Sequence, residues 1–159
     1  MEEQRDEVLM IRVLLVDDQP VVRHGLRVRF QLETDMQIVG EASTGSEALT
    51  LAQTLSPDVV LLDIEMPGMD GIEATAALRT VVPQSAVVIS SIHADRQTRI
   101  RAQAAGAVTF VEKRGTTETL LVAIRQAAGQ RGANTEQREK RSPPDRADGT
   151  RAEDDASRP

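Results

Sequence analysis

Residues 58–74 read DVVLLDIEMPGMDGIEA and decide the fold of this 159-residue chain. The run at 58–62 is short and almost wholly apolar, which is typical of a strand buried on both faces of a sheet. It ends at Asp63, and the turn-rich loop at 66–71 separates it from a helix predicted for residues 72–82. A buried strand, an acid and a helix in this order indicate one unit of a parallel α/β sheet.

The same alternation recurs on both sides of this unit. Further apolar runs predict strands, and the segments between them carry helical spacing, starting residues and stops. The other strands are predicted at 11–16, 36–42, 86–91 and 107–111, and the other helices at 20–32, 47–55, 95–105 and 116–128. We therefore expect a doubly wound, five-stranded parallel sheet with helices on both faces.

The composition excludes several classes of function. The chain has 25 acidic and 19 basic residues, and its net charge of −6 disfavours binding to a phosphate backbone. It has no cysteine, so disulfides, thiolate metal sites and cysteine nucleophiles are excluded. His24 and His93 are too few for a histidine metal cage, and Phe30 and Phe110 are too few for a base-stacking platform.

The two ends differ from the middle in composition. Residues 1–9 are polar and acidic, and we expect them to be a flexible extension, with Met10 as an alternative start. Residues 129–159 contain no Val, Ile, Leu, Met or Phe, and we expect a disordered polar tail because little surface there can be buried. The predicted domain is 10–128. No secretory signal or membrane span is predicted, which indicates a cytoplasmic protein.

Polar residues cluster where the predicted strands end. In open α/β sheets, ligands bind at the carboxyl ends of the strands. The residues at those ends are Asp17, Asp18, Asp63, Ser90, Ser91 and Lys113. Three close carboxylates repel one another, at about 4 kcal/mol for a pair roughly 4 Å apart in an effective dielectric of about 20. The cluster must therefore bind a proton, an ammonium group or a cation.

An all-oxygen cluster of this kind suits Mg²⁺ or Mn²⁺ better than zinc. A carboxylate beside such an ion can act as a nucleophile toward phosphorus, and Lys113 can then neutralise charge on the phosphoryl oxygens. A single Asp at a strand end is most often a helix cap or a solvated turn residue. The joint occurrence at several strand ends favours a functional site.

These motifs resemble the receiver domain of bacterial two-component response regulators over about residues 11–128. The resemblance rests on the closing helix and on LLVDDQPVVRHGL (14–26), DVVLLDIEMPGMDGIEA (58–74), VVISSIHAD (87–95) and AGAVTFVEK (105–113). It implies a flavodoxin-like sheet with strand order 2-1-3-4-5. The loop at 33–49 is most similar to a subfamily that usually carries a C-terminal helix-turn-helix. The polar residues after 128 do not suit such a domain, so we expect no DNA binding.

The resemblance also implies a role for each residue at the carboxyl edge. A sensor histidine kinase would be the partner, and its phosphohistidine would be the phosphoryl donor. The implied roles are Asp63 as phosphoacceptor, Asp17, Asp18 and Asp63 with the backbone carbonyl of Glu65 as Mg²⁺ ligands, Lys113 as the phosphoryl-binding cation, Ser91 as the switch hydroxyl and Phe110 as the switch aromatic. The Glu65 carboxylate could also pair with Lys113. Counting forward from Asp63 instead favours Ser90 as the switch hydroxyl.

The expected function is that of a phospho-accepting response regulator, not a turnover enzyme. Phosphorylation would switch an interaction surface made by the segments 95–105, 107–111 and 116–128, to which a downstream protein or a second copy would bind. Three alternatives stay open: a phosphatase with an aspartate nucleophile, an interaction module that is never phosphorylated, and a truncated transcription factor.

Overall fold

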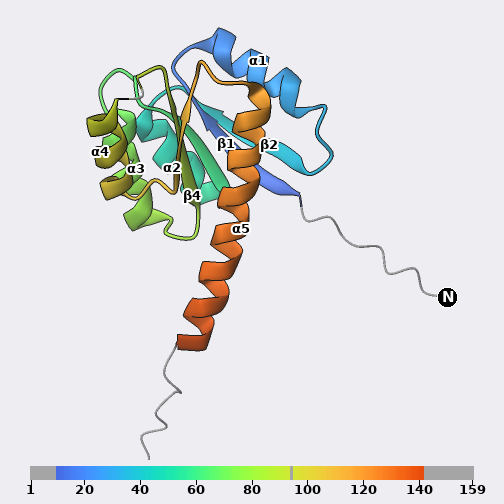
Figure 1. Ribbon diagram of the computed structural model, residues 1–159, viewed down its shortest axis with the longest axis vertical. Helices are drawn as coiled ribbons and strands as arrows, with labels where there is room; N and C mark the ends of the chain where they lie inside the picture. The colour runs from blue at the N-terminus through green and yellow to red at the C-terminus, as the bar shows by residue number, and fades with distance from the viewer. Residues whose placement is uncertain (1–9, 94, 142–159) are drawn as a thin grey trace, which may run out of the picture.

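The protein has a parallel sheet between two layers of helices (Figure 1). The computed structural model describes residues 10–93 and 95–141, with side chains up to residue 130. The elements are β1 (Ile11–Val16), α1 (Pro20–Phe30), β2 (Met36–Ala42), α2 (Gly45–Leu55), β3 (Val59–Asp63), α3 (Gly71–Val81), β4 (Ala86–Ser91), α4 (Arg96–Ala105), β5 (Thr109–Glu112) and α5 (Thr117–Arg141).

The sheet has five strands in the order β2-β1-β3-β4-β5, and every pair is parallel. This confirms the predicted α/β class and the strand order that the resemblance implied. β1 and β3 are neighbours, with Val16 opposite Leu62, so the residues that follow these strands meet at one edge. None of the helices in the described part of the chain is long and apolar enough to cross a membrane.

Side chains alternate between two cores, one on each face of the sheet. The α1/α5 core contains Leu15 of β1 and Leu61 of β3, packed under α1 and α5. The α2–α4 core contains Val16 and Leu62, packed under α2, α3 and α4. All five residues of β3 are buried, which explains why its sequence is a continuous apolar run.

Side-chain caps fix where several helices begin. Asp70 accepts hydrogen bonds from the backbone N–H groups of Ile72 and Glu73 at 2.9 Å each, at the start of α3. Asp95 caps α4 in the same way through the N–H of Thr98. These caps satisfy backbone donors that have no partner inside a helix.

The predicted end of the last helix is wrong. We expected α5 to stop at Ala128 and a disordered tail to begin at Gly129, but α5 continues to Arg141 and projects past the sheet (Figure 1). The segment 129–141 is rich in Gln, Glu, Arg and Lys, which are good helix formers. A helix that is already nucleated and anchored can propagate through such residues without an apolar face. The expectations for residues 1–9 and 142–159 lie outside the described residues.

Gly71 is required at the start of α3, where the chain comes very close to β3. A Cβ atom at this position would lie 2.3 Å from the backbone oxygen of Asp63 and 2.6 Å from the Cα of Ile64. We expect Gly71→Ala to lower the free energy of unfolding by about 1–3 kcal/mol, because backbone atoms cannot move aside cheaply.

The matched control for this substitution is Gly25→Ala in α1. A Cβ atom there would meet nothing within 4 Å. This variant should gain about 0.5–1 kcal/mol from the higher helix propensity of alanine. Denaturant unfolding measures both values, and equal stability of the two variants would contradict the close approach at Gly71.

Candidate functional site

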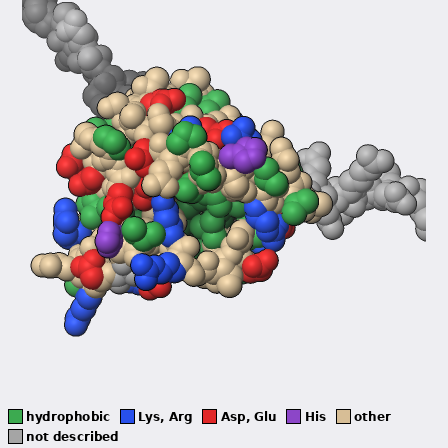
Figure 2. All heavy atoms as spheres, turned by 90° about the horizontal axis from the view of Figure 1, so that it is seen from above, with side chains coloured by type: hydrophobic (Ala, Val, Ile, Leu, Met, Phe, Trp, Pro, Cys, Tyr) green, Lys and Arg blue, Asp and Glu red, His purple; other side chains and the backbone are tan. Residues whose placement is uncertain are grey.

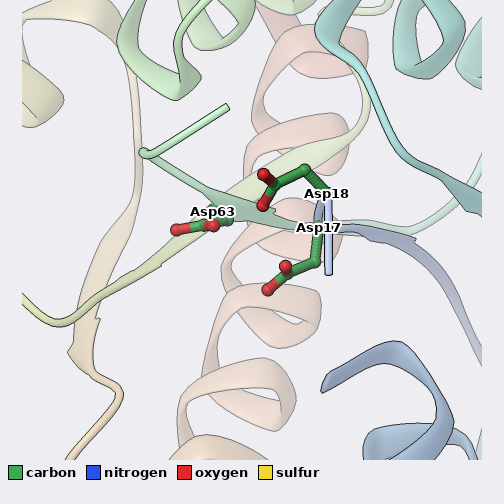
Figure 3. A group of neighbouring side chains, drawn as sticks. All are labelled: Asp17, Asp18 and Asp63. Carbon is green, nitrogen blue, oxygen red and sulfur yellow. The ribbon is translucent and has the colours of Figure 1, made fainter. Parts of the chain in front are cut away.

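Three carboxylates meet at the carboxyl edge of the sheet (Figure 3). Asp17 and Asp18 directly follow β1, and Asp63 is the last residue of the neighbouring β3. One oxygen from each carboxylate lies within 4.8 Å of the others. Asp17 and Asp63 are only 3% and 6% exposed, whereas Asp18 is partly exposed. The sequence therefore predicted this convergence correctly.

Lys113 joins two of these carboxylates. Its Nζ atom lies 2.9 Å from Oδ2 of Asp17 and 3.3 Å from Oδ2 of Asp63. The lysine follows β5, and its backbone N–H donates to the carbonyl of Ser91 at 2.9 Å. One ammonium group thus lies beside a pair of buried acids. This agrees with the prediction that the residues at the strand ends meet at one edge of the sheet.

The protonation behaviour of this cluster follows from burial and charge. Burial raises the pKa of Asp63, and the nearby charge of Asp17 raises it further, although Lys113 acts in the opposite direction. Burial by itself lowers the pKa of Lys113, but its hydrogen bond to Asp17 and the charges of both acids outweigh burial and raise this pKa. The lysine therefore stays protonated at neutral pH, and Asp63 is ionised less readily than an exposed aspartate.

Backbone and side-chain donors hold the acids in position. The N–H of Gln19 donates to Oδ1 of Asp17 at 2.9 Å, and the guanidinium of Arg23 donates to the backbone oxygen of Asp17 at 2.6 Å. The N–H of Glu65 donates to Oδ1 of Asp63 at 3.2 Å. These hydrogen bonds leave the second oxygen of each carboxylate directed toward Lys113.

The donor set fits a hard divalent cation. The cluster carries three carboxylates against one ammonium group and offers only oxygen atoms as ligands. Mg²⁺ prefers such oxygens, keeps several of its waters and therefore needs an open site. The partly exposed Asp18 provides that opening. The pocket has the chemistry to bind a metal ion of this type.

The cluster opens into a pocket of about 470 Å³. Its polar lining includes Asp17, Asp18, Asp63, Glu65, Ser90 and Lys113, and its apolar lining comes mainly from α1, the strands and the start of α5. Figure 2 shows the molecule from above, with acidic and basic side chains close together around a recess that exposes apolar side chains. A small anion could therefore reach the acids and the lysine from solvent.

The two serines at the end of β4 lie on different faces of the sheet. Ser90 pairs with Asp63 in the strand register and lines the pocket. Ser91 is fully buried, and its Oγ accepts a hydrogen bond from the N–H of His93 at 3.0 Å. Alternation along β4 places Ser91 on the side of the α2–α4 core, where Phe110 also packs.

Glu65 contacts His93, not Lys113. The His93 Nε2 and Glu65 Oε1 atoms are 2.5 Å apart, and both side chains are exposed, at 65% and 49%. The pairing with Lys113 that the sequence allowed is therefore not the one in the structure. The contact of Glu65 with His93 was missed because it joins two loops that the chain separates widely, and no local pattern marks such a contact.

Comparison with known proteins identifies the family. The model of the response regulator receiver domain matches residues 13–125. The chain is 40% identical over 119 residues to the transcriptional regulatory protein LiaR of Bacillus subtilis, covering 75% of this chain and 56% of LiaR. The chain belongs to the response regulator receiver family of two-component systems. It spans about half the length of the curated relatives that it matches.

Solved structures agree with this assignment. The signal receiver domain of the putative response regulator NarL from Mycobacterium tuberculosis is 35% identical with a TM-score of 0.72, over 76% of this chain and 98% of that one. A CheX–CheY–BeF₃–Mg²⁺ complex from Borrelia burgdorferi matches at 28% identity with a TM-score of 0.69, over 74% of this chain and 89% of that one. The fold is that of CheY-like receivers.

Proposed function

We propose that Asp63 accepts a phosphoryl group from the phosphohistidine of a sensor histidine kinase in a Mg²⁺-dependent step. The observation that carries this proposal is the contact of Lys113 with two buried acids, Asp17 and Asp63, in a cluster that also includes Asp18. The fold of the receiver family and the open pocket support it.

In the proposed step, one carboxylate oxygen of Asp63 forms a bond to phosphorus while the bond from phosphorus to the histidine nitrogen breaks. The electron pair of that bond stays on the leaving imidazole. Lys113 keeps its proton and moves its charge from the acids toward the phosphoryl oxygens. Mg²⁺, bound by Asp17, Asp18, Asp63 and the carbonyl of Glu65, would neutralise further charge on those oxygens. The Mg²⁺ in the Borrelia CheY complex supports this choice of metal.

The kinase would approach beside α1. The pocket wall includes Gln19 and Val22, so the first turn of α1 borders the entrance. The outer side of the same helix exposes apolar side chains at Val21 (83% exposed) and Val28 (49% exposed). Apolar side chains this exposed next to the entrance suit contact with the protein that delivers the phosphoryl group.

The proposed output is a change in the face formed by α4, β5 and α5. Ser91 would move toward the new phosphoryl oxygens, and Phe110 would turn inward on the same side of the sheet. Ser91 suits this role because it shares a face with Phe110, whereas Ser90 faces the pocket and is the alternative. A downstream protein or a second copy would then bind the altered face.

The proposal includes no turnover of small substrates and no DNA binding by the residues present here. Hydrolysis of small phosphate esters by the purified protein would favour the phosphatase alternative. The match covers only 56% and 54% of the two relatives named as transcriptional regulators, and their DNA-related activity is not carried over to this chain. The proposal keeps the cytoplasmic location that the sequence predicted.

Glu65 provides a test of the pocket entrance. Glu65→Gln should speed phosphorylation by acetyl phosphate by roughly two- to fivefold, because it removes a carboxylate that repels this anionic donor. In water, the repulsion between two unit charges about 8 Å apart is about 0.5 kcal/mol for each negative charge of the donor. The gain should shrink at high salt, where this repulsion is screened. The measurement is the initial rate of phosphorylation in the presence of Mg²⁺.

The matched control is Glu73→Gln, which changes an exposed carboxylate in the first turn of α3. Its labelling rate should equal that of the wild type. A Glu65→Gln rate equal to the wild-type rate would place this carboxylate too far from the path of the donor to matter.

A further inference from the structure

We propose that Arg99 of α4 is a positioning residue that holds the Phe110 ring in its present place and so opposes the switch. The inference rests on the proposed function, because it assigns a residue to the restraint that phosphorylation must overcome. The resemblance gave roles to Ser91 and Phe110 but none to any residue of α4.

Two contacts of Arg99 carry the proposal. Its Cζ atom lies 4.9 Å from the centroid of the Phe110 ring, within the range of a cation–π interaction. Its Nη2 atom lies 2.8 Å from Oε1 of Glu112. One guanidinium thus contacts the aromatic ring and a carboxylate two residues further along β5. A planar guanidinium suits this combination, because it can lie over a ring and still donate in its own plane.

The strand register places this contact next to the proposed switch hydroxyl. Phe110 pairs with Ile89 of β4, and Glu112 pairs with Ser91. Because paired residues of adjacent strands share a face, Ser91, Phe110 and Glu112 all lie on the α4 side of the sheet. Any inward turn of Phe110 must break its contact with the guanidinium.

Phe110 is held loosely enough for this restraint to matter. It is partly exposed and packs only at the margin of the α2–α4 core. It also lines a surface groove together with Arg99, Glu112 and residues of α5. No closed cavity therefore fixes the ring. A contact that changes the ratio of its present and inward positions by a factor of about two to five is enough to shift where the ring lies.

The test uses fluorine NMR, for which this chain is well suited. It contains two phenylalanines, so labelling the full chain with 4-fluorophenylalanine gives one signal from Phe110 and one from the buried Phe30. Arg99→Gln should move the Phe110 signal and leave the Phe30 signal in place. Glu112→Gln should move the Phe110 signal less, since the guanidinium keeps its charge over the ring.

The matched control is Arg101→Gln, which removes the same charge from an exposed position about 200° around α4 from Arg99. Its Phe110 signal should match that of the wild type. An unchanged signal in Arg99→Gln, or an equal shift in Arg101→Gln, overturns the proposal.

Acetyl phosphate with Mg²⁺ provides the second arm. Phosphorylated wild type should show Phe110 at a new position. The two proteins are compared at the same degree of phosphorylation, below saturation. Arg99→Gln should then populate that new position about two- to fivefold more than the wild type does. Two results overturn the proposed restraint by Arg99. One is phosphorylated protein whose Phe110 signal has not moved, and the other is an equal population of the new position in the two proteins. If no phosphorylation occurs, the proposed function is contradicted instead. The fluorine signals of the unphosphorylated variants still test the contact of Arg99 with Phe110.

Discussion

Asp63→Asn is expected to abolish incorporation of a phosphoryl group from acetyl phosphate and Mg²⁺. The neutral amide is a very poor nucleophile toward phosphorus, and Asp63 is the acid at the end of β3 that lies beside Lys113. The wild type should gain one acid-stable, base-labile group, detected by intact-mass measurement under acidic conditions.

Asp95→Asn is the matched control for this substitution. It makes the same chemical change at the cap of α4, where asparagine also caps well, so labelling should persist. Equal labelling of Asp63→Asn and wild type would show that another residue accepts the group. Loss of labelling in Asp95→Asn would show that the assay responds to general damage.

Mg²⁺ is expected to stabilise the wild type by about 2.7 kcal/mol at a hundredfold excess over its dissociation constant. Asp18→Ala should remove most of that gain, because it deletes the most exposed carboxylate of the cluster. Without metal, the same variant should be more stable than the wild type, since it relieves repulsion among the acids.

The raised pKa of Asp63 predicts how the stabilisation by Mg²⁺ changes with pH. A raised pKa means that the folded protein binds the proton more tightly than the unfolded chain does. The contribution of Asp63 to the free energy of unfolding is therefore most favourable at low pH and is lost as pH rises through the folded pKa. The stabilisation by Mg²⁺ should accordingly grow from acidic to neutral pH, where Asp63 is ionised and available to the metal.

Thermal melts with and without Mg²⁺ measure the stabilisation by the metal and the stability of Asp18→Ala without it. Glu73→Ala removes an exposed carboxylate that does not belong to the cluster and should keep the full metal-dependent shift. An Mg²⁺ shift that is the same in Asp18→Ala and wild type would place the metal elsewhere.

The parts of the fold that the sequence predicted well share one property, which is that the signal is local. The run at 59–62 is apolar because both faces of β3 are buried, and Asp63 follows because that strand ends at the polar edge. The meeting of Asp17 with Asp63 needed only that β1 and β3 be neighbours. Lys113 joined them because β5 ends at the same edge.

The missed features depend on contacts between distant segments or on helix propagation. The extension of α5 to Arg141 carries no apolar periodicity, so its sequence looked unstructured. The contact of His93 with Glu65 joins separate loops. The contact of Arg99 with Phe110 depends on how α4 lies against β5, which no spacing within α4 reveals.

The most direct test of the central claim is to map the modified residue in the wild type. The protein is incubated with acetyl phosphate and Mg²⁺, the acyl phosphate is reduced with borohydride, and the digested peptides are sequenced by mass spectrometry. The expected result is a single homoserine in place of Asp63, in the peptide that contains the end of β3. Conversion of Asp17, Asp18 or any other acid in place of Asp63, or no conversion at all under conditions in which Mg²⁺ binds, would contradict it.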